Sequence, residues 1–226
     1  MVAKKGRGLL MVYVDVPAAL EDEFNRWYNE EHIPERLAIP GVLNAARYEA
    51  VRGGPKYLAC YELEEPEAYF SATWQQRLAH PTAWTLRMSP EKIGTRFVRN
   101  LYRLIYPDTV SEAIAQADMS PALLVGRMEV PEPLDSAFNT AYNTERLPLY
   151  RTIPGYTRAR RFIAVQREPS DEPHYTTVHE CQRPEVADSP EWEAVRKAHT
   201  PVWSEHLSMH MRFAPGSPGV YRRIFP

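Results

Sequence analysis

The chain has 226 residues, 44% of them hydrophobic and 25% charged, with a formal net charge of −2. This balance is typical of a globular protein and gives no general attraction to nucleic acid or to an anionic membrane. No stretch reaches the about 20 apolar residues of a membrane helix, and the basic start MVAKKGRG lacks the apolar core of a signal peptide, so we expect a cytoplasmic protein. Cys60 and Cys181 have no CxxC or Cys/His spacing, which predicts no metal site.

The first hundred residues predict the element order βαββαβ. Residues 9–16 alternate and are ended by Pro17, whereas the following segment carries apolar side chains at helical spacing behind an acidic start. The expected elements are a strand at 9–16, a helix at 19–37, a hairpin of strands at 42–51 and 56–64, a helical stretch at 66–88 interrupted at Pro81, and a strand at 95–106.

The same order recurs in the second half of the chain. Residues 24–41 (FNRWYNEEHIPERLAIPG) and 138–155 (FNTAYNTERLPLYRTIPG) are identical at nine of eighteen positions, at an offset of 114. Further on, AHPTAWT from Ala79 aligns with AHTPVWS from Ala198. Self-similarity at this scale indicates an internal duplication.

We therefore predict an α+β protein built from two tandem ferredoxin-like units with antiparallel sheets. The first unit spans residues 1–106, a linker spans 107–120, and the second unit spans 121–226. Each four-stranded sheet would carry both helices on one face and leave the other face bare. The two bare faces can pack together or close into a barrel within one chain.

The run WYNEEHIPERLAIPG, with a strand on each side, resembles the first-helix signature of the dimeric α/β-barrel superfamily, in particular its EthD-like branch. Both halves carry the resemblance, although Trp27 and His32 become Ala141 and Arg146 in the second. The resemblance implies an intramolecular barrel with helices outside and a ligand cavity between sheet and helices. Members of the superfamily include cofactor-free monooxygenases, muconolactone isomerase, polyketide cyclases, aldoxime dehydratases and haem enzymes such as chlorite dismutase, so the fold alone does not define a reaction.

His32 is the first candidate for catalysis, because imidazole is the usual acid–base group near neutral pH and the second half replaces it with Arg146. The alternative is a histidine that only caps the end of its helix. Tyr61 and Arg47, on the two hairpin strands, are the candidates for polarising a substrate carbonyl. Expected substrate-binding residues are Tyr13, Asp15, Phe24, Trp27 and Tyr28.

Other polar residues are assigned by comparing the two halves. Glu31 and Glu145 are equivalent, which favours a structural role, yet Glu31 could still orient His32 from behind. His80 and His199 are also equivalent and are interpreted as structural. His179 replaces Tyr61 and, with Arg161, marks a second candidate site in the second half; a satisfied core histidine is the alternative.

The pattern favours an enzyme that needs no cofactor and uses His32 for proton transfer on an aromatic, polyketide-like or other apolar carbonyl compound. The expected chemistry is that of an isomerase, dehydratase, lyase or cyclase, or of a cofactor-free oxygenase. One alternative is a haem enzyme with His179 or His199 as ligand; another is a non-enzymatic ligand-binding or stress-related protein. The expected partner is a small molecule, with no nucleic acid and no membrane, and the chain is either a monomer with an internal pseudo-dimer or a homodimer. Motifs for nucleotides, zinc proteases and serine hydrolases are absent.

Overall fold

The computed structural model describes residues 2–203, 207 and 209–226. Its strands are β1 (Gly8–Asp15), β2 (Val42–Arg52), β3 (Tyr57–Leu63), β4 (Arg96–Tyr106), β5 (Ala122–Glu129), β6 (Tyr156–Glu168), β7 (Tyr175–Cys181), β8 (Arg212–Phe213) and β9 (Gly219–Phe225). Its α-helices are α1 (Glu21–Trp27), α2 (Ile33–Leu37), α3 (Ala72–Ala79), α4 (Ala83–Met88), α5 (Pro90–Ile93), α6 (Glu112–Ala115), α7 (Asp135–Ala141), α8 (Leu147–Tyr150) and α9 (Pro190–Lys197). Within the described residues, no helix is long and apolar enough to cross a membrane.

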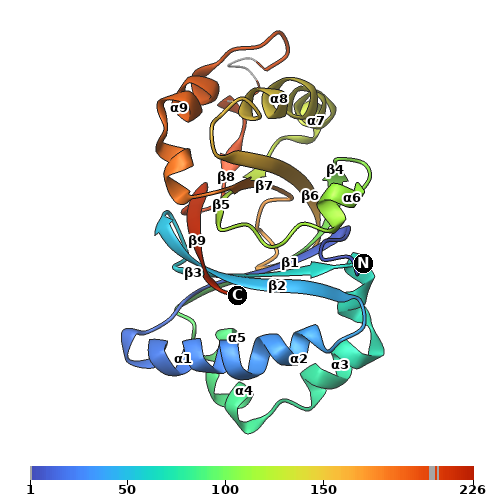
Figure 1. Cartoon of the computed structure of the whole chain (residues 1–226), viewed down its shortest axis with the longest axis vertical. Helices are drawn as coiled ribbons and strands as arrows, with labels where there is room; N and C mark the ends of the chain where they lie inside the picture. Colours follow the sequence, from blue (N-terminus) through green and yellow to red (C-terminus); the bar gives the residue numbers. More distant parts are fainter. Residues whose placement is uncertain (1, 204–206, 208) are drawn as a thin grey trace.

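Eight strands form a closed antiparallel barrel. They are hydrogen-bonded in the order β7-β6-β4-β1-β3-β2-β9-β5, and β5 pairs with β7 to close the ring. The first four strands of the chain lie together as β4-β1-β3-β2, and the contacts β4–β6 and β2–β9 join them to the strands of the second half. Helices α1–α5 cover one end of the molecule and α7–α9 the opposite end (Figure 1). The expected α+β barrel is therefore confirmed.

The alternation of β1 separates two environments. Leu9, Met11 and Tyr13 point into the barrel, where they join a buried cluster with residues of the second half. Leu10, Val12 and Val14 point outward and pack against the helices of the first half. Because successive strand side chains face opposite sides of a sheet, any ligand cavity under the helices is lined by the second set.

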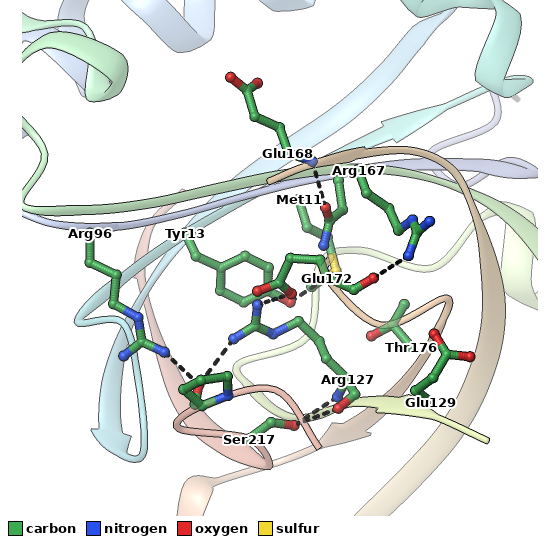
Figure 2. A network of polar contacts seen from close by, with 12 residues as sticks. Met11, Tyr13, Arg96, Arg127, Glu129, Arg167, Glu168, Glu172, Thr176 and Ser217 are labelled. Carbon is green, nitrogen blue, oxygen red and sulfur yellow. Dashed lines mark hydrogen bonds and ion pairs between the residues drawn. The ribbon is translucent and has the colours of Figure 1, made fainter. Parts of the chain in front are cut away.

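Polar side chains fill much of the barrel interior. Arg127 forms a buried ion pair with Glu172 and lies 4.4 Å from the ring centre of Tyr13 (Figure 2). In a second buried cluster, Arg160 forms a bidentate ion pair with Glu62. Only about 10 Å³ of free space lies beside Glu62, close to the minimum that holds one water molecule. The barrel interior is therefore a packed core.

Each half has a guanidinium that ties the first helix to the sheet. Arg47 on β2 is 1% exposed and donates hydrogen bonds to the Oδ1 atoms of Asn25 (2.6 Å) and Asn29 (2.9 Å). Arg161 on β6 does the same for Asn139 (2.8 Å) and Asn143 (2.6 Å). The sequence spacing between the partners is the same in both halves. Both arginines therefore hold the first helix of their half at a fixed distance from the sheet.

The strands begin and end within two residues of the predicted bounds in the first half. The predicted helix 19–37 is divided by a π-helical turn at Tyr28–His32, and the stretch 66–88 is divided into a 3₁₀ segment, α3 and α4, with α5 following. Pro81 and Pro90 have no backbone N–H to donate, and the extended backbone of Ser89 separates α4 from α5. The predicted linker 107–120 contains the short helix α6, which the sequence analysis missed.

Replacing Arg47 by Met should destabilise the protein, because the change leaves the amide oxygens of Asn25 and Asn29 without their buried donor. We expect a loss of about 1–3 kcal/mol for each stranded acceptor, measured by urea unfolding. Arg161→Met should cost a similar amount. Arg26→Met is the matched control, since Arg26 is exposed on the same helix and should change stability by less than about 0.5 kcal/mol. An Arg47→Met variant as stable as the parent would contradict the assigned role.

Candidate functional site

A cavity of about 360 Å³ lies in the first half, between the outer face of the sheet and the helices. Leu10 and Val12 of β1 and Tyr61 of β3 form its floor, and Tyr28, His32 and Arg36 form one wall. Trp74 of α3, which lies against Arg36, and residues between 77 and 92 complete the lining. The volume is at the lower end of the about 300–1,000 Å³ range of small-molecule sites. The cavity therefore suits a ligand of two or three rings.

His32 closes the π-helical turn Tyr28–His32. Such turns insert one extra residue into a helix and are frequent at functional sites. The ring centre of His32 lies 4.5 Å from Trp27, 4.9 Å from Tyr28 and 6.3 Å from Tyr61. Its Nδ1 is buried without a protein partner, and neither ring nitrogen makes a hydrogen bond within the described residues. The imidazole is thus held by aromatic packing and keeps its polar atoms free.

His32 is neutral at physiological pH. Burial lowers its pKa well below the ordinary value of 6.5, and the nearby charges of Arg36 and Arg47 lower the pKa further. Among the described residues, no carboxylate contacts the ring to oppose these effects. A neutral imidazole can accept a proton, donate a hydrogen bond or bind a metal ion.

Tyr61 is the second polar group on the cavity floor. Its hydroxyl is buried, and no well-aligned hydrogen bond reaches it. Burial raises its pKa well above 10, and the phenol of Tyr28 adds to the rise. Tyr61 therefore stays protonated and can donate a hydrogen bond to a ligand oxygen.

Unpaired polar atoms are concentrated at this cavity. Among the described residues, eight buried side-chain nitrogen and oxygen atoms lack a partner, and five of them belong to residues that line it. These five are His32 Nδ1, Arg36 Nη1, Tyr61 Oη, Trp74 Nε1 and Arg99 Nε. Buried polar groups in proteins are normally hydrogen-bonded, so such a cluster indicates a site that accepts a polar ligand.

The structure brings together three of the residues proposed for chemistry and binding: Tyr28, His32 and Tyr61 line the cavity. Trp27 and Phe24 lie behind them in the core, and Trp27 contacts the His32 ring. Both are fully buried and so shape the wall from behind it.

The remaining first-half residues lie elsewhere, which corrects their expected roles. Tyr13 lies inside the barrel, on the other side of the sheet from the cavity. Asp15 accepts a hydrogen bond from the backbone N–H of Lys56 (2.6 Å). Arg47 is saturated by Asn25 and Asn29 beneath the first helix, so it cannot polarise a substrate carbonyl.

Glu31 does not orient His32. Its Oε1 accepts hydrogen bonds from Trp27 Nε1 (3.1 Å), Thr82 (2.6 Å) and Thr85 (3.1 Å). In the second half, Glu145 accepts hydrogen bonds from Thr200 and from the backbone of Trp203. Glu31 thus joins its helix to the segment 82–85, and Glu145 joins its helix to the segment 200–203. Both glutamates have a structural role.

The second-half candidates are packed differently. His179 is 2% exposed, and its Nδ1 is hydrogen-bonded to the hydroxyl of Tyr156 (3.2 Å). The rings of Tyr150 and Trp192 lie 4.7 Å and 5.3 Å from it, and burial lowers its pKa to about 3. Arg161 is held by two asparagines, as described above. His179 therefore lies within a packed aromatic cluster.

Arg36, Trp74 and Arg99 are among the cavity residues that the sequence analysis did not identify. One signal could have revealed Arg36, because at the offset of 114 it aligns with Tyr150 and so differs between the halves, as His32 does. Trp74 and Arg99 carried no such signal, and only the tertiary structure places them here.

The described residues contain no cluster of three or more histidine, cysteine or carboxylate side chains that could hold a metal ion. His199, one of the two proposed haem ligands, is exposed, and the other, His179, is packed among rings. His32 is the histidine that lines the cavity.

Solved structures with a similar fold come from several enzyme groups. The chlorite dismutase of Candidatus Nitrospira defluvii in complex with imidazole has a TM-score of 0.59 at 11% identity, covering 99% of this chain and 92% of the other. An anthrone oxidase-like protein gives 0.54 at 10% identity, covering 99% and 94%. A protein of Lactobacillus acidophilus, provisionally described as a monooxygenase, gives 0.52 at 12% identity, covering 97% and 94%. At these identities the likeness shows the fold alone, that of the dimeric α/β-barrel proteins.

Sequence comparison is less informative. A family model described as a domain of unknown function (DUF4286) matches residues 7–89, well under half of the chain. No protein of curated function matches the sequence.

The structural neighbours correct one expectation from the sequence. We predicted no cofactor, but several similar structures are chlorite dismutases, which depend on haem. That prediction is therefore wrong, and haem is a candidate cofactor.

The neutral buried histidines predict a loss of stability in acid. The pKa of His179 is about 3 in the folded chain and near 6.5 when unfolded, so below pH 6.5 only the unfolded chain takes up the proton. The contribution of His179 to the free energy of unfolding is therefore fully present above pH 6.5 and is lost as the pH falls toward 3. Between pH 7 and pH 5 the loss is about 2 kcal/mol. His179→Gln should remove that share of the pH dependence in urea unfolding. The exposed His80→Gln is the control and should keep the parent slope.

Proposed function

We propose that the chain is an enzyme that removes a proton from a carbon activated by the carbonyl group of a flat, largely apolar compound. The observation that carries the proposal is that a neutral imidazole, His32, and the hydroxyl of Tyr61, which lies beside the Tyr28 phenol, line the same cavity. The similar structures support small-molecule enzyme activity in general.

In this proposal His32 accepts the proton through the ring nitrogen that faces the cavity. Tyr61 donates a hydrogen bond to the carbonyl oxygen, where negative charge develops as the C–H bond breaks. A donor placed at the position of developing charge is among the strongest catalytic devices available to a protein.

The charges around His32 restrict the reaction. A free imidazolium would lie close to Arg36 and Arg47, whose charges oppose its formation. Proton transfer to His32 is therefore favourable only when an enolate or a similar anion forms beside it at the same time. This requirement favours substrates whose carbanion is strongly delocalised, such as fused-ring aromatic ketones.

We further propose that the chain is an internal duplication of an EthD-like unit in which, among the described residues, the first copy keeps an open cavity. The repeated sequence, the paired clamps of Arg47 and Arg161, and the π-helical turns at Tyr28–His32 and Tyr142–Arg146 support it. In the second copy, Tyr156 stands where Val42 stands in the first and fills space beside His179.

Anthrone is a suitable probe, because a similar structure is that of an anthrone oxidase-like protein. Exchange of its ring-CH₂ protons with deuterated buffer, followed by NMR without oxygen, isolates the proton removal. His32→Ala should reduce the rate about 100-fold or more, the usual size of a general-base effect. Tyr61→Phe should reduce it about 10–100-fold, since one donor to the developing charge is lost.

His80→Ala is the matched control, since His80 is exposed and outside the cavity, and it should keep the parent rate. Circular dichroism confirms that each variant remains folded. A His32→Ala variant that exchanges anthrone protons at the parent rate would contradict the proposal. Binding of anthrone without any exchange would favour a ligand-binding protein.

Haem binding in the same cavity is the second candidate function. The donor set fits the group chemically, since His32 is a neutral imidazole with free nitrogens, and Arg77 and Lys92 at the cavity could bind the propionates. The cavity of about 360 Å³ is smaller than a haem, so binding would require the helices around it to move apart. Among the described residues, Arg77 has no hydrogen-bond or ion-pair partner. A haem iron would supply redox and oxygen chemistry there.

Titration of the purified protein with hemin tests this second function. If His32 holds the iron, the parent protein should develop a sharp, saturable Soret band, and His32→Ala should lose it or shift it. His179→Ala is the matched control and should bind as the parent does. A Soret band unchanged in His32→Ala would contradict the assignment of His32 as iron ligand.

A further inference from the structure

Arg36 stands out among the buried charges of the molecule. It lies on α2, is 5% exposed and lines the cavity, with its guanidinium 5.1 Å from the ring centre of Trp74. Its Nη1 is buried without a protein partner, and no carboxylate forms an ion pair with it in the described residues. A buried cation without a partner is costly in free energy.

The other buried arginines show how the fold normally treats such a group. Six described arginines are buried, and five of them donate hydrogen bonds to carboxylates, amide oxygens or backbone carbonyls; these five are Arg47, Arg127, Arg146, Arg160 and Arg161. Arg36 is the exception. In the aligned position of the second half, Tyr150 packs on Trp192 at 4.7 Å, so this place in the fold does not require a cation.

The groups beside Arg36 are also donors. Trp74 Nε1 and the Tyr61 hydroxyl lack partners, and the neutral His32 ring has one N–H. Of the other charged residues at the cavity, Arg77 and Lys92 are positive, and Glu91 is already paired with Arg99. The polar lining therefore offers hydrogen-bond donors and positive charge, which are complementary to an anionic ligand group that accepts hydrogen bonds.

We propose that Arg36 binds the carboxylate of an aromatic acid, with the ring of the ligand lying against the apolar floor of the cavity. A guanidinium can donate two parallel hydrogen bonds to a carboxylate, and the Arg36 guanidinium already lies over the Trp74 ring, 5.1 Å from its centre. This inference rests on the cavity assigned under the proposed function and adds the chemical class of its substrate: a flat ring system that carries both a carbonyl group and a carboxylate.

Calorimetric titration with 2-naphthoate and with its neutral isostere 2-naphthamide tests the inference. The full-length protein should bind naphthoate at least 10-fold more tightly than naphthamide. Arg36→Met should abolish that preference and leave the affinity for naphthamide unchanged, whereas Arg36→Lys, which keeps the charge, should restore part of it. Arg87→Met is the matched control, because Arg87 is exposed outside the cavity lining, and it should keep the preference.

Thermal unfolding without ligand gives an independent readout. Arg36→Met should melt at a higher temperature than the parent, since it removes an unpartnered buried charge, and naphthoate should raise the melting temperature of the parent more than that of the variant. A lower melting temperature for Arg36→Met would show a structural role and overturn the inference.

The two proposals fail in different ways. Equal affinity for naphthoate and naphthamide in the parent would overturn the carboxylate site and leave the cavity intact as a binding site. Absence of binding by both compounds would overturn the cavity as a site for flat aromatic ligands, and the inference with it.

Discussion

The closed and filled barrel is the constraint on which the rest of the structure depends. Its interior contains buried ion pairs such as Arg127–Glu172 and Arg160–Glu62, with almost no free volume beside the second pair. A ligand must therefore bind on the outer face of the sheet, beneath the helices. Arg47 and Arg161 set the distance between sheet and first helix, so they define the space that is left.

The two halves use that space in opposite ways. At three aligned positions the first half has His32, Arg36 and Tyr61, and the second has Arg146, Tyr150 and His179. In the second half, Arg146 donates to the backbone carbonyl of Ala198 and His179 bonds Tyr156, so the polar groups are satisfied. In the first half the equivalent groups keep free atoms at the cavity. The same three residue types thus form a packed core in one half and a reactive surface in the other.

The strands and their order along the chain could be predicted, because alternation and turn residues are local signals. Which face each strand presents to the helices could not. β1 and β3 pair so that Leu10 lies opposite Tyr61 and Tyr13 opposite Leu58, and this register separates the two tyrosines. One face of a strand can be read from the sequence, but its match to a neighbouring strand depends on tertiary pairing. Tyr13 was therefore placed in the wrong compartment.

Arg36 was missed for a different reason. It follows His32 by four residues, so the two side chains share a helix face, and both line the cavity. In the sequence, His32 was interpreted by itself, and its helix face was not extended to this residue. Comparison of the two halves remained the better guide, since His32, Arg36 and Tyr61 all differ from their counterparts.

The positions of His32 and Arg36 link ligand binding to base strength. Arg36 is one of the two charges that lower the pKa of His32, and Arg47 is the other. A carboxylate bound to Arg36 would neutralise the positive charge of Arg36. The pKa of His32 would then rise toward the range in which imidazole is an effective base. A ligand that carries the carboxylate would therefore increase the basicity of the histidine that removes its proton. A neutral analogue such as anthrone would meet a weaker base and react more slowly than the acid, so selection for the anion would occur in the chemical step as well as in binding.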